Sequence, residues 1–145
     1  MHPRTLVRSL VVPADPDTVW ALVGGFAGLG DWHPHVPPAT VEDGADPELP
    51  GAVRAFTLDG AVVARERLLA RDPAARSYRY TLLEPLALPV EEYVATLAVT
   101  GHPDGAELRW TASYRAPDAL VPKVEAAFGD GVYATGLDAV RKRLS

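Results

Sequence analysis

The segment AVRAFTLDGAVVARERLLAR, residues 52–71, contains two apolar-rich runs that meet at Asp59-Gly60. An Asp-Gly pair between two such runs is a strong short-range signal for a β-hairpin, because both residues tolerate the left-handed backbone of a two-residue turn. We therefore expect strands at residues 52–58 and 61–71, paired antiparallel. Similar runs and turns recur further along the chain, which favours a fold built on an antiparallel β-sheet.

Further strands are expected on both sides of the hairpin. Those after it are residues 76–84, 92–100 and 106–115, separated by turn-forming residues at 72–75, 85–89 and 101–105. Successive short connections favour an antiparallel meander. Before the hairpin, residues 5–12 predict a first strand, and a short strand is expected near Thr40.

Helices are expected near both ends of the chain. Asp15 provides an N-cap and Pro16 the first helical residue, which together predict a helix at residues 17–23. A second short helix or turn is expected at residues 26–32, and one long helix at residues 118–144. This order predicts an α+β fold in which a curved antiparallel sheet of about six to seven strands is covered by the long C-terminal helix.

The composition narrows the classes of function. The 145 residues fit a single domain, residues 1–145, with a net charge of −5 and no cysteine. An acidic chain offers no field that attracts nucleic acid or anionic lipid, so we expect neither as a partner. The start of the chain is too broken for a signal peptide, and no apolar stretch reaches membrane length. We therefore expect a cytoplasmic monomer or homodimer without stable membrane insertion.

Charged residues indicate which side of the second hairpin strand faces solvent. Arg65, Arg67 and Arg71 share one side of this strand with Leu69. Burying three guanidinium groups would be costly, so we expect this side to face water. Glu66 then points into an otherwise apolar interior. A carboxylate there can act as an acid, a base or a fixed hydrogen-bond acceptor, or it can simply be satisfied by backbone or tyrosine groups.

The same parity argument directs aromatic side chains with polar tips toward the interior. The predicted inner rows are Tyr78, Tyr80 and Leu82, then Tyr93, Ala95, Leu97 and Val99, then Leu108, Trp110, Ala112 and Tyr114. A core built only for stability would use aliphatic residues, because buried hydroxyl and indole N–H groups need partners. Aromatic side chains with polar tips on one face of a sheet are typical of the lining of a ligand cavity.

The long helix carries glycines on the side that we expect to face the sheet. At about 100° per residue, one arc contains Gly129, Val132, Gly136 and Val140, with Phe128 and Tyr133 beside it. Two explanations remain open, namely close packing of the backbone or a hollow that holds a ligand. We favour the hollow, and expect it to be lined by Trp32, Tyr78, Tyr80, Leu82, Tyr93, Trp110, Tyr114, Phe128, Val132 and Gly136.

Several of these residues together resemble a known superfamily. The resemblance is carried by Val19-Trp20-Ala21-Leu22-Val23, Phe26, Trp32-His33-Pro34, Glu66-Arg67-Leu68, Tyr80, Tyr93 and the terminal helix. In these features the chain is similar to the helix-grip (SRPBCC) proteins, which include START lipid-transfer domains, Bet v 1 allergens, plant abscisic-acid receptors and bacterial polyketide cyclase/dehydrase-like proteins. The resemblance implies a curved sheet that grips the C-terminal helix around a hydrophobic cavity.

The resemblance also implies roles for particular residues. In the abscisic-acid receptors a pocket lysine stands at the place of His33, and pocket residues match Glu66, Tyr80 and Tyr93. A further receptor glutamate is replaced by Trp110, which argues against hormone-like polar recognition. The first receptor gate loop is reduced to the two-residue turn Asp59-Gly60, which argues against a role in hormone signalling. The family binds small hydrophobic molecules, often aromatic or polycyclic, and some members catalyse cyclisation or dehydration.

His33 and Glu66 are the candidates for acid/base catalysis. An unperturbed imidazole titrates near neutrality, so His33 could move protons beside Glu66 at the cavity wall. The alternative is that the His33 ring caps a helix end or lies in solvent. His33-Pro34-His35 lacks a third ligand in a fixed element, so we predict no metal site. No phosphate-binding or cofactor motif is present, and we predict no cofactor.

Three functions remain open at this point. The first is an acid/base enzyme of the polyketide cyclase/dehydrase type, acting on a small hydrophobic substrate. The second is a non-catalytic carrier or sensor for a lipid-like ligand, with the loop at residues 85–89 as a gate. The third is an interaction module with a filled core, which would bind no such ligand.

Overall fold

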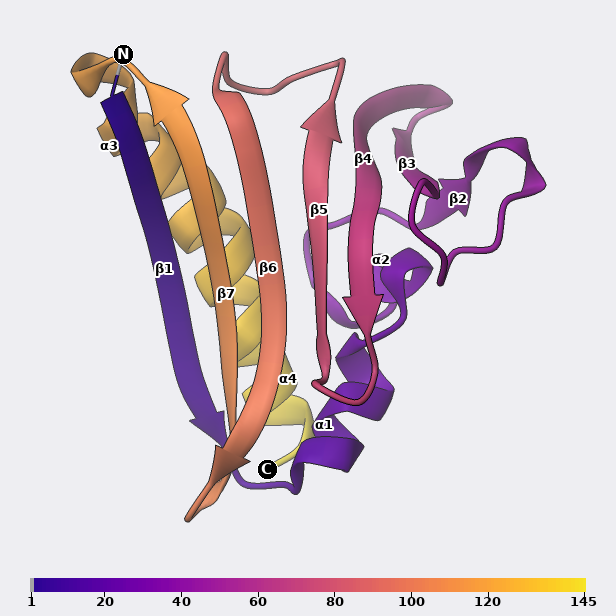
Figure 1. Ribbon diagram of the computed structural model, residues 1–145, viewed down its shortest axis with the longest axis vertical. Coiled ribbons are helices and arrows are strands. Elements are labelled where there is room, and N and C mark those ends of the chain that lie inside the picture. Colours follow the sequence, from indigo (N-terminus) through magenta and orange to yellow (C-terminus); the bar gives the residue numbers. More distant parts are fainter. Residues whose placement is uncertain (1) are drawn as a thin grey trace.

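The computed structural model describes residues 2–145 and shows seven antiparallel strands in one curved sheet (Figure 1). The strands are β1 (His2–Val12), β2 (Ala39–Val41), β3 (Val53–Leu58), β4 (Ala61–Asp72), β5 (Ser77–Leu83), β6 (Glu91–His102) and β7 (Gly105–Ala116). Their order in the sheet is β1-β7-β6-β5-β4-β3-β2. The predicted meander is confirmed, and β1 completes the sheet beside the last strand.

Two short helices follow β1 and cover part of the concave face of the sheet. Helix α1 (Pro16–Val23) begins after Asp15, whose carboxylate accepts the N–H of Thr18 at 3.0 Å. A 3-10 turn (Phe26–Gly28) leads into α2 (Leu29–Trp32). A second 3-10 turn (Glu42–Gly44) lies in the long connection before β3. The sequence prediction of a capped helix and a second short one is therefore confirmed.

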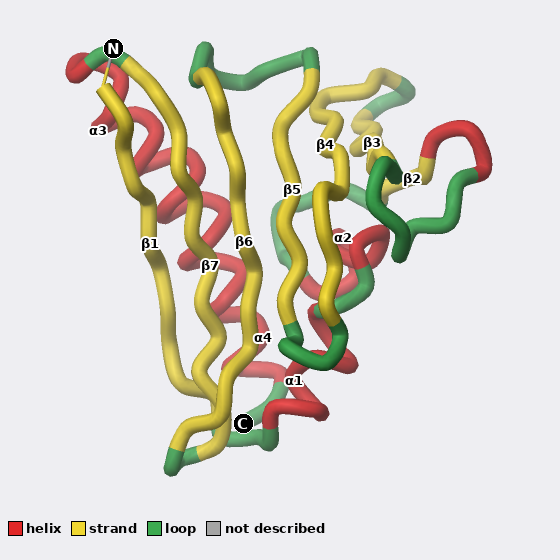
Figure 2. The backbone as a smooth tube through the Cα atoms, in the orientation of Figure 1, coloured by secondary structure: helices red, strands yellow, loops and turns green. Residues whose placement is uncertain are grey.

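The C-terminal helical segment runs behind β1, β7 and β6, as Figure 2 shows. It consists of a 3-10 turn (Asp118–Leu120), α3 (Val121–Val124), the π-helical segment η4 (Glu125–Ala134) and α4 (Thr135–Arg143). A π-helix has i→i+5 hydrogen bonds and so places more residues in each turn than an α-helix. The expected long helix is present, but the uniform spacing used to assign its inner arc does not hold over η4. The helix-grip architecture of an α+β protein is confirmed.

A β-bulge overturns one orientation that strand parity predicted. The pairing of β4 with β5 shifts between Leu68 and Ala70, so Arg71 lies opposite the buried Tyr78. Its Nε donates to the carbonyl oxygen of Gly24 at 2.9 Å, and its guanidinium lies 5.2 Å from a ring of Trp20. The prediction that Arg71 faces solvent with the other two arginines of β4 was wrong, because an extra residue in one strand reverses the parity beyond it.

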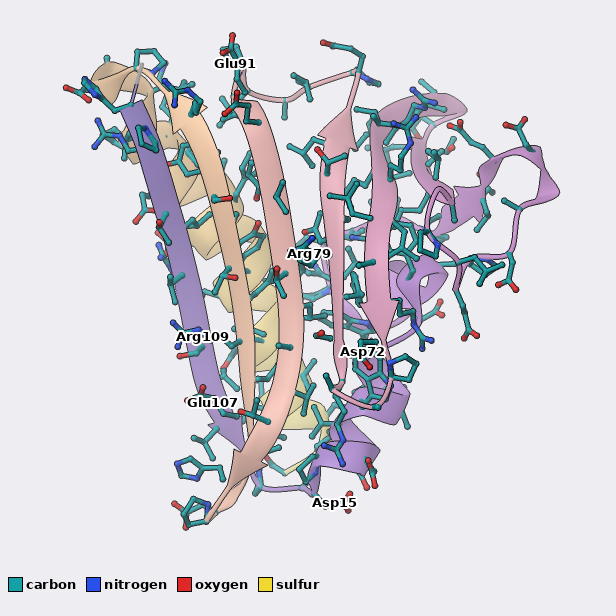
Figure 3. All side chains as sticks on the ribbon, viewed as in Figure 1. Asp15, Asp72, Arg79, Glu91, Glu107 and Arg109 are labelled. Atoms are coloured by element: carbon teal, nitrogen blue, oxygen red, sulfur yellow. The ribbon has the colours of Figure 1, made fainter. Side chains whose placement is uncertain are left out.

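Elsewhere the two faces of the sheet agree with the predicted parity. Figure 3 labels Arg79, Glu107 and Arg109 on β5 and β7, and the two arginines are exposed. Trp110, on the opposite side of β7, is fully buried and stacks on Tyr133 of η4, with ring centroids 4.5 Å apart. The core therefore lies between the concave face and the helices. None of the helices described between residues 2 and 145 combines the length and apolar character needed to cross a membrane.

Candidate functional site

A cavity of about 220 Å³ lies on the concave side of the sheet, between the strands and η4. It is lined by Leu29, Val36, Pro37, Phe56, Val63, Ala64, Arg65, Glu66, Tyr80, Leu82, Leu83, Pro85, Leu86, Ala87, Tyr93, Phe128, Val132 and Tyr133. These side chains come from α2, the loop after it, β3 to β6 and η4. The lining is mostly apolar and aromatic, with few charged groups, as is usual for sites that bind small molecules.

The cavity forms where β5 and β6 separate. The ladder between these strands ends at the pair Thr81 and Val94, although β5 continues to Leu83. The hydroxyl of Thr81 donates to the carbonyl oxygen of Tyr93 at 2.7 Å, which satisfies a backbone group beside the end of the ladder. The loop that connects the two strands contributes Pro85 and its next two residues to the wall. The proline-bounded loop singled out in the sequence is therefore part of the cavity.

The Glu66 carboxylate, which lines the cavity, belongs to a buried ion pair. Arg54 on β3 is fully buried and pairs in the sheet with Glu66 on β4. Its Nε donates to Oε1 of Glu66 at 2.8 Å, and its Nη2 lies 2.6 Å from the same oxygen. Its Nη1 donates to the carbonyl oxygen of Phe26 at 2.8 Å. The prediction that Glu66 points inward is confirmed, and its partner is a residue that the sequence argument did not consider.

Aromatic rings enclose the Arg54 guanidinium. Its centre lies 4.2 Å from the ring centroid of Phe26 and 4.6 Å from that of Tyr80, distances at which a cation is attracted to an aromatic face. Burial on its own would lower the pKa of Arg54, but the charge of Glu66 and the nearby phenols raise it above its ordinary value. The guanidinium therefore remains charged and needs Glu66 as its counter-ion.

One oxygen of Glu66 is left for the cavity. Both close contacts from Arg54 reach Oε1, and the carboxylate of Glu66 has no other hydrogen bond within residues 2–145. The side chain is 14% exposed and lines the cavity. Oε2 of Glu66 is thus a hydrogen-bond acceptor with a fixed position and a free lone pair.

Three tyrosine hydroxyls surround the same end of the cavity. The hydroxyls of Tyr93 and Tyr133 are hydrogen-bonded to each other, and Tyr80 accepts the indole N–H of Trp110 at 3.0 Å. Burial raises the pKa of Tyr80, Tyr93 and Tyr133, and the charge of Glu66 also raises the pKa of each. These phenols therefore stay protonated at neutral pH and can donate hydrogen bonds, but they are poor bases.

His33 lies apart from the cavity lining. It is 4% exposed; its Nδ1 accepts the backbone N–H of His35 at 3.1 Å, and its Nε2 lies 2.7 Å from the carbonyl oxygen of Val132. Since Nδ1 accepts, Nε2 carries the proton and donates to Val132. Burial lowers the pKa of His33. Both ring nitrogens are thus engaged by the backbone, which favours the structural alternative for this residue; its catalytic role stays an untested prediction.

The glycines of the C-terminal segment serve close packing. A Cβ at Gly136 would lie 2.7 Å from the His33 ring, and one at Gly129 would lie 2.9 Å from a methyl group of Leu6. Neighbouring side chains fill the space beside these two glycines, which favours close packing, the first of the two explanations that the sequence left open. The cavity instead lies beside Phe128 and Val132 of the same segment.

The predicted lining residues divide into two groups. Those on the cavity wall, besides Glu66, are Tyr80, Leu82, Tyr93, Phe128 and Val132. Those packed elsewhere in the structure are Trp32, Tyr78, Trp110, Tyr114 and Gly136. Tyr78, Trp110 and Tyr114 lie on the predicted side of their strands, where Tyr78 packs against Trp20 of α1 and Trp110 against Tyr133 of η4. Among residues 2–145, no group of three or more His, Asp or Glu side chains is placed to hold a metal ion.

Comparison with protein-family models identifies the family. The chain belongs to the family described as polyketide cyclase / dehydrase and lipid transport, whose model matches residues 3–145. The resemblance inferred from the sequence to the polyketide cyclase-like helix-grip proteins is therefore confirmed. A search of curated proteins found no significant match.

Solved structures with the same fold include proteins of several kinds. A Thermobifida fusca protein determined by solution NMR is 38% identical, with a TM-score of 0.89, over 97% of this chain and 92% of that one. The Zhui aromatase/cyclase from a Streptomyces species is 21% identical, with a TM-score of 0.75, over 99% of this chain and 94% of that one. Norcoclaurine synthase from Thalictrum flavum, in complex with dopamine and hydroxybenzaldehyde, is 21% identical, with a TM-score of 0.73, over 98% of this chain and 86% of that one. The latter two likenesses show the shared fold.

Proposed function

We propose that this protein binds one small aromatic molecule in the cavity between β5, β6 and η4. The observation that carries the proposal is an apolar cavity with aromatic walls and one carboxylate oxygen free to accept a hydrogen bond. An apolar cavity of roughly 150 Å³ holds benzene, whereas sites for drug-sized molecules occupy about 300–1,000 Å³. A cavity of about 220 Å³ therefore suits one ring or two fused rings. The larger polycyclic ligands expected from the sequence would require the walls to move apart.

The arrangement also supports acid/base catalysis by Glu66. Oε2 of Glu66 can take a proton from a carbon or oxygen of the bound molecule, while a protonated phenol of Tyr93 or Tyr133 donates to a carbonyl oxygen on which negative charge develops. Such proton transfers assist cyclisation and dehydration, and each is typically worth about 10²–10⁴-fold in rate. His33 would act on this chemistry by holding Val132 in place, since its ring nitrogens are engaged.

A non-catalytic carrier is the second candidate function. It is favoured by the ion pair itself, because Arg54 holds Glu66 as a fixed acceptor and the neighbouring phenols are all protonated. A group of this kind can anchor a ligand hydroxyl without moving a proton. In this case the loop with Pro85 would open and close the cavity around an unchanged ligand.

Native mass spectrometry after gentle purification distinguishes the two candidates. We expect a bound small molecule at one per chain, and its conversion after incubation would identify an enzyme, whereas its unchanged recovery would identify a carrier. Ala64→Phe places a ring in the cavity and should abolish binding, while Ala61→Phe, at the exposed start of β4, is the matched control. If both variants bind small aromatic molecules as the wild type does, the proposed site is wrong.

The remaining features of this proposal rest on composition. The net charge of −5 and the absence of cysteine favour a cytoplasmic protein that has no nucleic-acid partner. We propose that the chain acts as a monomer or homodimer, since the cavity is enclosed by residues of a single chain. Analytical ultracentrifugation with and without ligand tests the oligomeric state.

A further inference from the structure

We infer that the cavity selects neutral aromatic molecules with a hydroxyl donor, and that Arg54 sets this selectivity through Glu66 without touching the ligand. The inference rests on the proposed function and specifies its ligand class. Phenols and related hydroxyl-bearing rings would bind, whereas carboxylates and amines of the same size would be rejected. Arg54 is a positioning residue here, because it lies behind Glu66 and is absent from the cavity lining.

Two opposite charges lie at the polar end of the cavity. Arg54 is fully buried and charged, and Glu66 lies within 2.6 Å of it. The pair therefore presents no net charge to a ligand. An ammonium group beside Glu66 would add an uncompensated buried cation, which is unfavourable in a low-dielectric site. A carboxylate would face the lone pairs of Oε2 and would have no hydrogen to share with them.

An anionic ligand would need a free cation in the cavity wall. Arg65 also lines the cavity, but its guanidinium is engaged elsewhere. Its Nε and Nη2 donate to the two carboxylate oxygens of Glu42 at 2.6 Å and 2.7 Å, and its Nη1 donates to the carbonyl oxygen of Glu84 at 3.2 Å. Arg65 therefore has no free guanidinium edge for a ligand carboxylate, and Arg54 is fully buried outside the cavity lining.

The cavity offers a ligand one charged hydrogen-bond acceptor. Oε2 of Glu66 accepts a hydrogen bond, and a hydrogen bond to a charged acceptor is stronger than one between neutral groups. The Arg54 guanidinium packs against the rings of Phe26 and Tyr80 and donates to Oε1, so the orientation of Glu66 is fixed before the ligand arrives. The tyrosine hydroxyls of the wall are hydrogen-bonded to each other or to Trp110, and Arg65 is paired with Glu42, while most of the remaining lining is apolar. A flat neutral ring with one hydroxyl at its edge matches this arrangement.

Four naphthalene derivatives of similar size test the selectivity on the wild-type protein. The probes are naphthalene, 2-naphthol, 2-naphthoate and 2-(aminomethyl)naphthalene, each titrated at neutral pH by calorimetry or protein fluorescence. We expect 2-naphthol to bind about tenfold or more tightly than naphthalene, as one hydrogen bond to a charged group allows. The carboxylate and the amine should each bind at least tenfold more weakly than naphthalene.

Two variants show whether the Arg54–Glu66 pair sets this order. Glu66→Gln leaves the Arg54 charge uncompensated, so 2-naphthoate should gain on naphthalene while the preference for 2-naphthol shrinks. The double variant Arg54→Met with Glu66→Leu removes both charges, and 2-naphthol should then bind no more tightly than naphthalene. Glu107→Gln, on the outer face of β7, is the matched control and should keep the wild-type order. A purely structural role of Arg54 would change stability but not the order of the ligands.

The outcomes separate this inference from the proposed function. Binding of naphthalene with 2-naphthoate or the amine as the tightest ligand would overturn the selectivity and leave the cavity as the binding site. Equal affinity for naphthalene and 2-naphthol in the wild type would do the same. Binding of none of the four probes would overturn both proposals. If Glu66→Gln does not fold, the wild-type series and the double variant still decide the matter.

Discussion

The imidazole of His33 donates its Nε2 hydrogen to the carbonyl oxygen of Val132 and so joins the loop after α2 to the C-terminal helical segment. The backbone N–H of His35 donates to the other ring nitrogen, which keeps the ring neutral in this geometry. Protonation of Nδ1 would place its N–H against the backbone N–H of His35, and this hydrogen bond would be lost. Because Val132 lines the cavity, the neutral ring fixes part of the cavity wall.

Acid should therefore destabilise the protein through His33. Burial lowers the pKa of His33 below its ordinary value of 6.5, so at acidic pH the unfolded chain binds a proton that the folded chain excludes. The contribution of the neutral ring is complete above about pH 6.5 and is lost as the pH falls, by at most about 1.4 kcal/mol per pH unit. Urea denaturation at a series of pH values measures this slope.

His33→Gln tests that assignment directly. An amide can still donate to Val132 and accept from the His35 N–H, but it does not titrate. We expect a smaller loss of unfolding free energy between pH 7 and pH 5 in this variant than in the wild type. His102→Gln, at the end of β6, is the control and should keep the wild-type slope. Identical slopes for all three proteins would contradict the account of His33.

The two helical glycines Gly136 and Gly131 should respond in opposite ways to alanine. A Cβ at Gly136 would lie 2.7 Å from the His33 ring and 3.2 Å from Trp110, so Gly136→Ala should destabilise the fold by about 1–3 kcal/mol. A Cβ at Gly131 would meet only the carbonyl oxygen of Ala126, at 3.4 Å, so Gly131→Ala should be neutral or stabilise by up to about 1 kcal/mol. Thermal unfolding of both variants checks this. Equal destabilisation would show that the packing around Gly136 is not the cause.

Removal of Arg54 should cost more than removal of the whole ion pair. Arg54→Met leaves Glu66 buried without its counter-ion, and breaking a buried pair in this way typically costs about 3–5 kcal/mol. Replacing both partners by apolar residues, as in Arg54→Met with Glu66→Leu, should restore part of that loss. Arg79→Met, on the outer face of β5, should stay within about 0.5 kcal/mol of the wild type. A double variant less stable than the single Arg54 variant would contradict this view of the pair.

The buried phenols should resist ionisation until the protein unfolds. Burial raises the pKa of Tyr80, Tyr93 and Tyr133 above the usual 10, so the folded state holds protons that the unfolded chain releases. Their contribution to stability is present below about pH 10 and is lost as the pH rises further. In an alkaline titration, the phenolate absorbance of at least three of the five tyrosines should appear together with the loss of tertiary circular dichroism. Ionisation of all five in the native state would contradict this.

The order of elements was predictable because local signals were strong. The Asp59-Gly60 turn, the Asp15 cap and the alternating strands are features of short segments, and each is present in the structure. The inward side of Tyr80 and Tyr93 followed from the parity of the predicted strands. These predictions depend on neighbouring residues, and no distant contact changes them.

Two β-bulges explain why the buried Arg54 was missed and why the orientation of Arg71 was wrong. In an unbroken two-residue hairpin Arg54 would pair with Arg65, but the shift between Phe56 and Thr57 places it opposite Glu66. The conflict of like charges in the unbroken register was the signal that could have revealed the bulge and the buried pair. At Arg71 a second bulge reverses the side that parity assigns, and no comparable charge pattern marks it.

The place of the cavity depended on helix packing that the sequence did not reveal. Glycines can admit a ligand or a neighbouring side chain, and at Gly136 the neighbour is His33. The turns of η4 are π-helical, whereas the arc was drawn with α-helical spacing, yet Gly129 and Gly136 still pack against side chains of β1 and β7. The walls contributed by Pro37 and by the loop at Pro85 come from irregular segments, for which periodicity makes no prediction.

The most direct test is an NMR measurement of contacts between 2-naphthol and the protein. We predict intermolecular nuclear Overhauser effects from the naphthol ring protons to the rings of Tyr80, Tyr93 and Phe128, which line the cavity. They should disappear in Ala64→Phe and persist in Ala61→Phe. Effects confined to the exposed apolar side chains Leu58 and Val62, or no effects at saturating ligand, would contradict the claim that the cavity is the binding site.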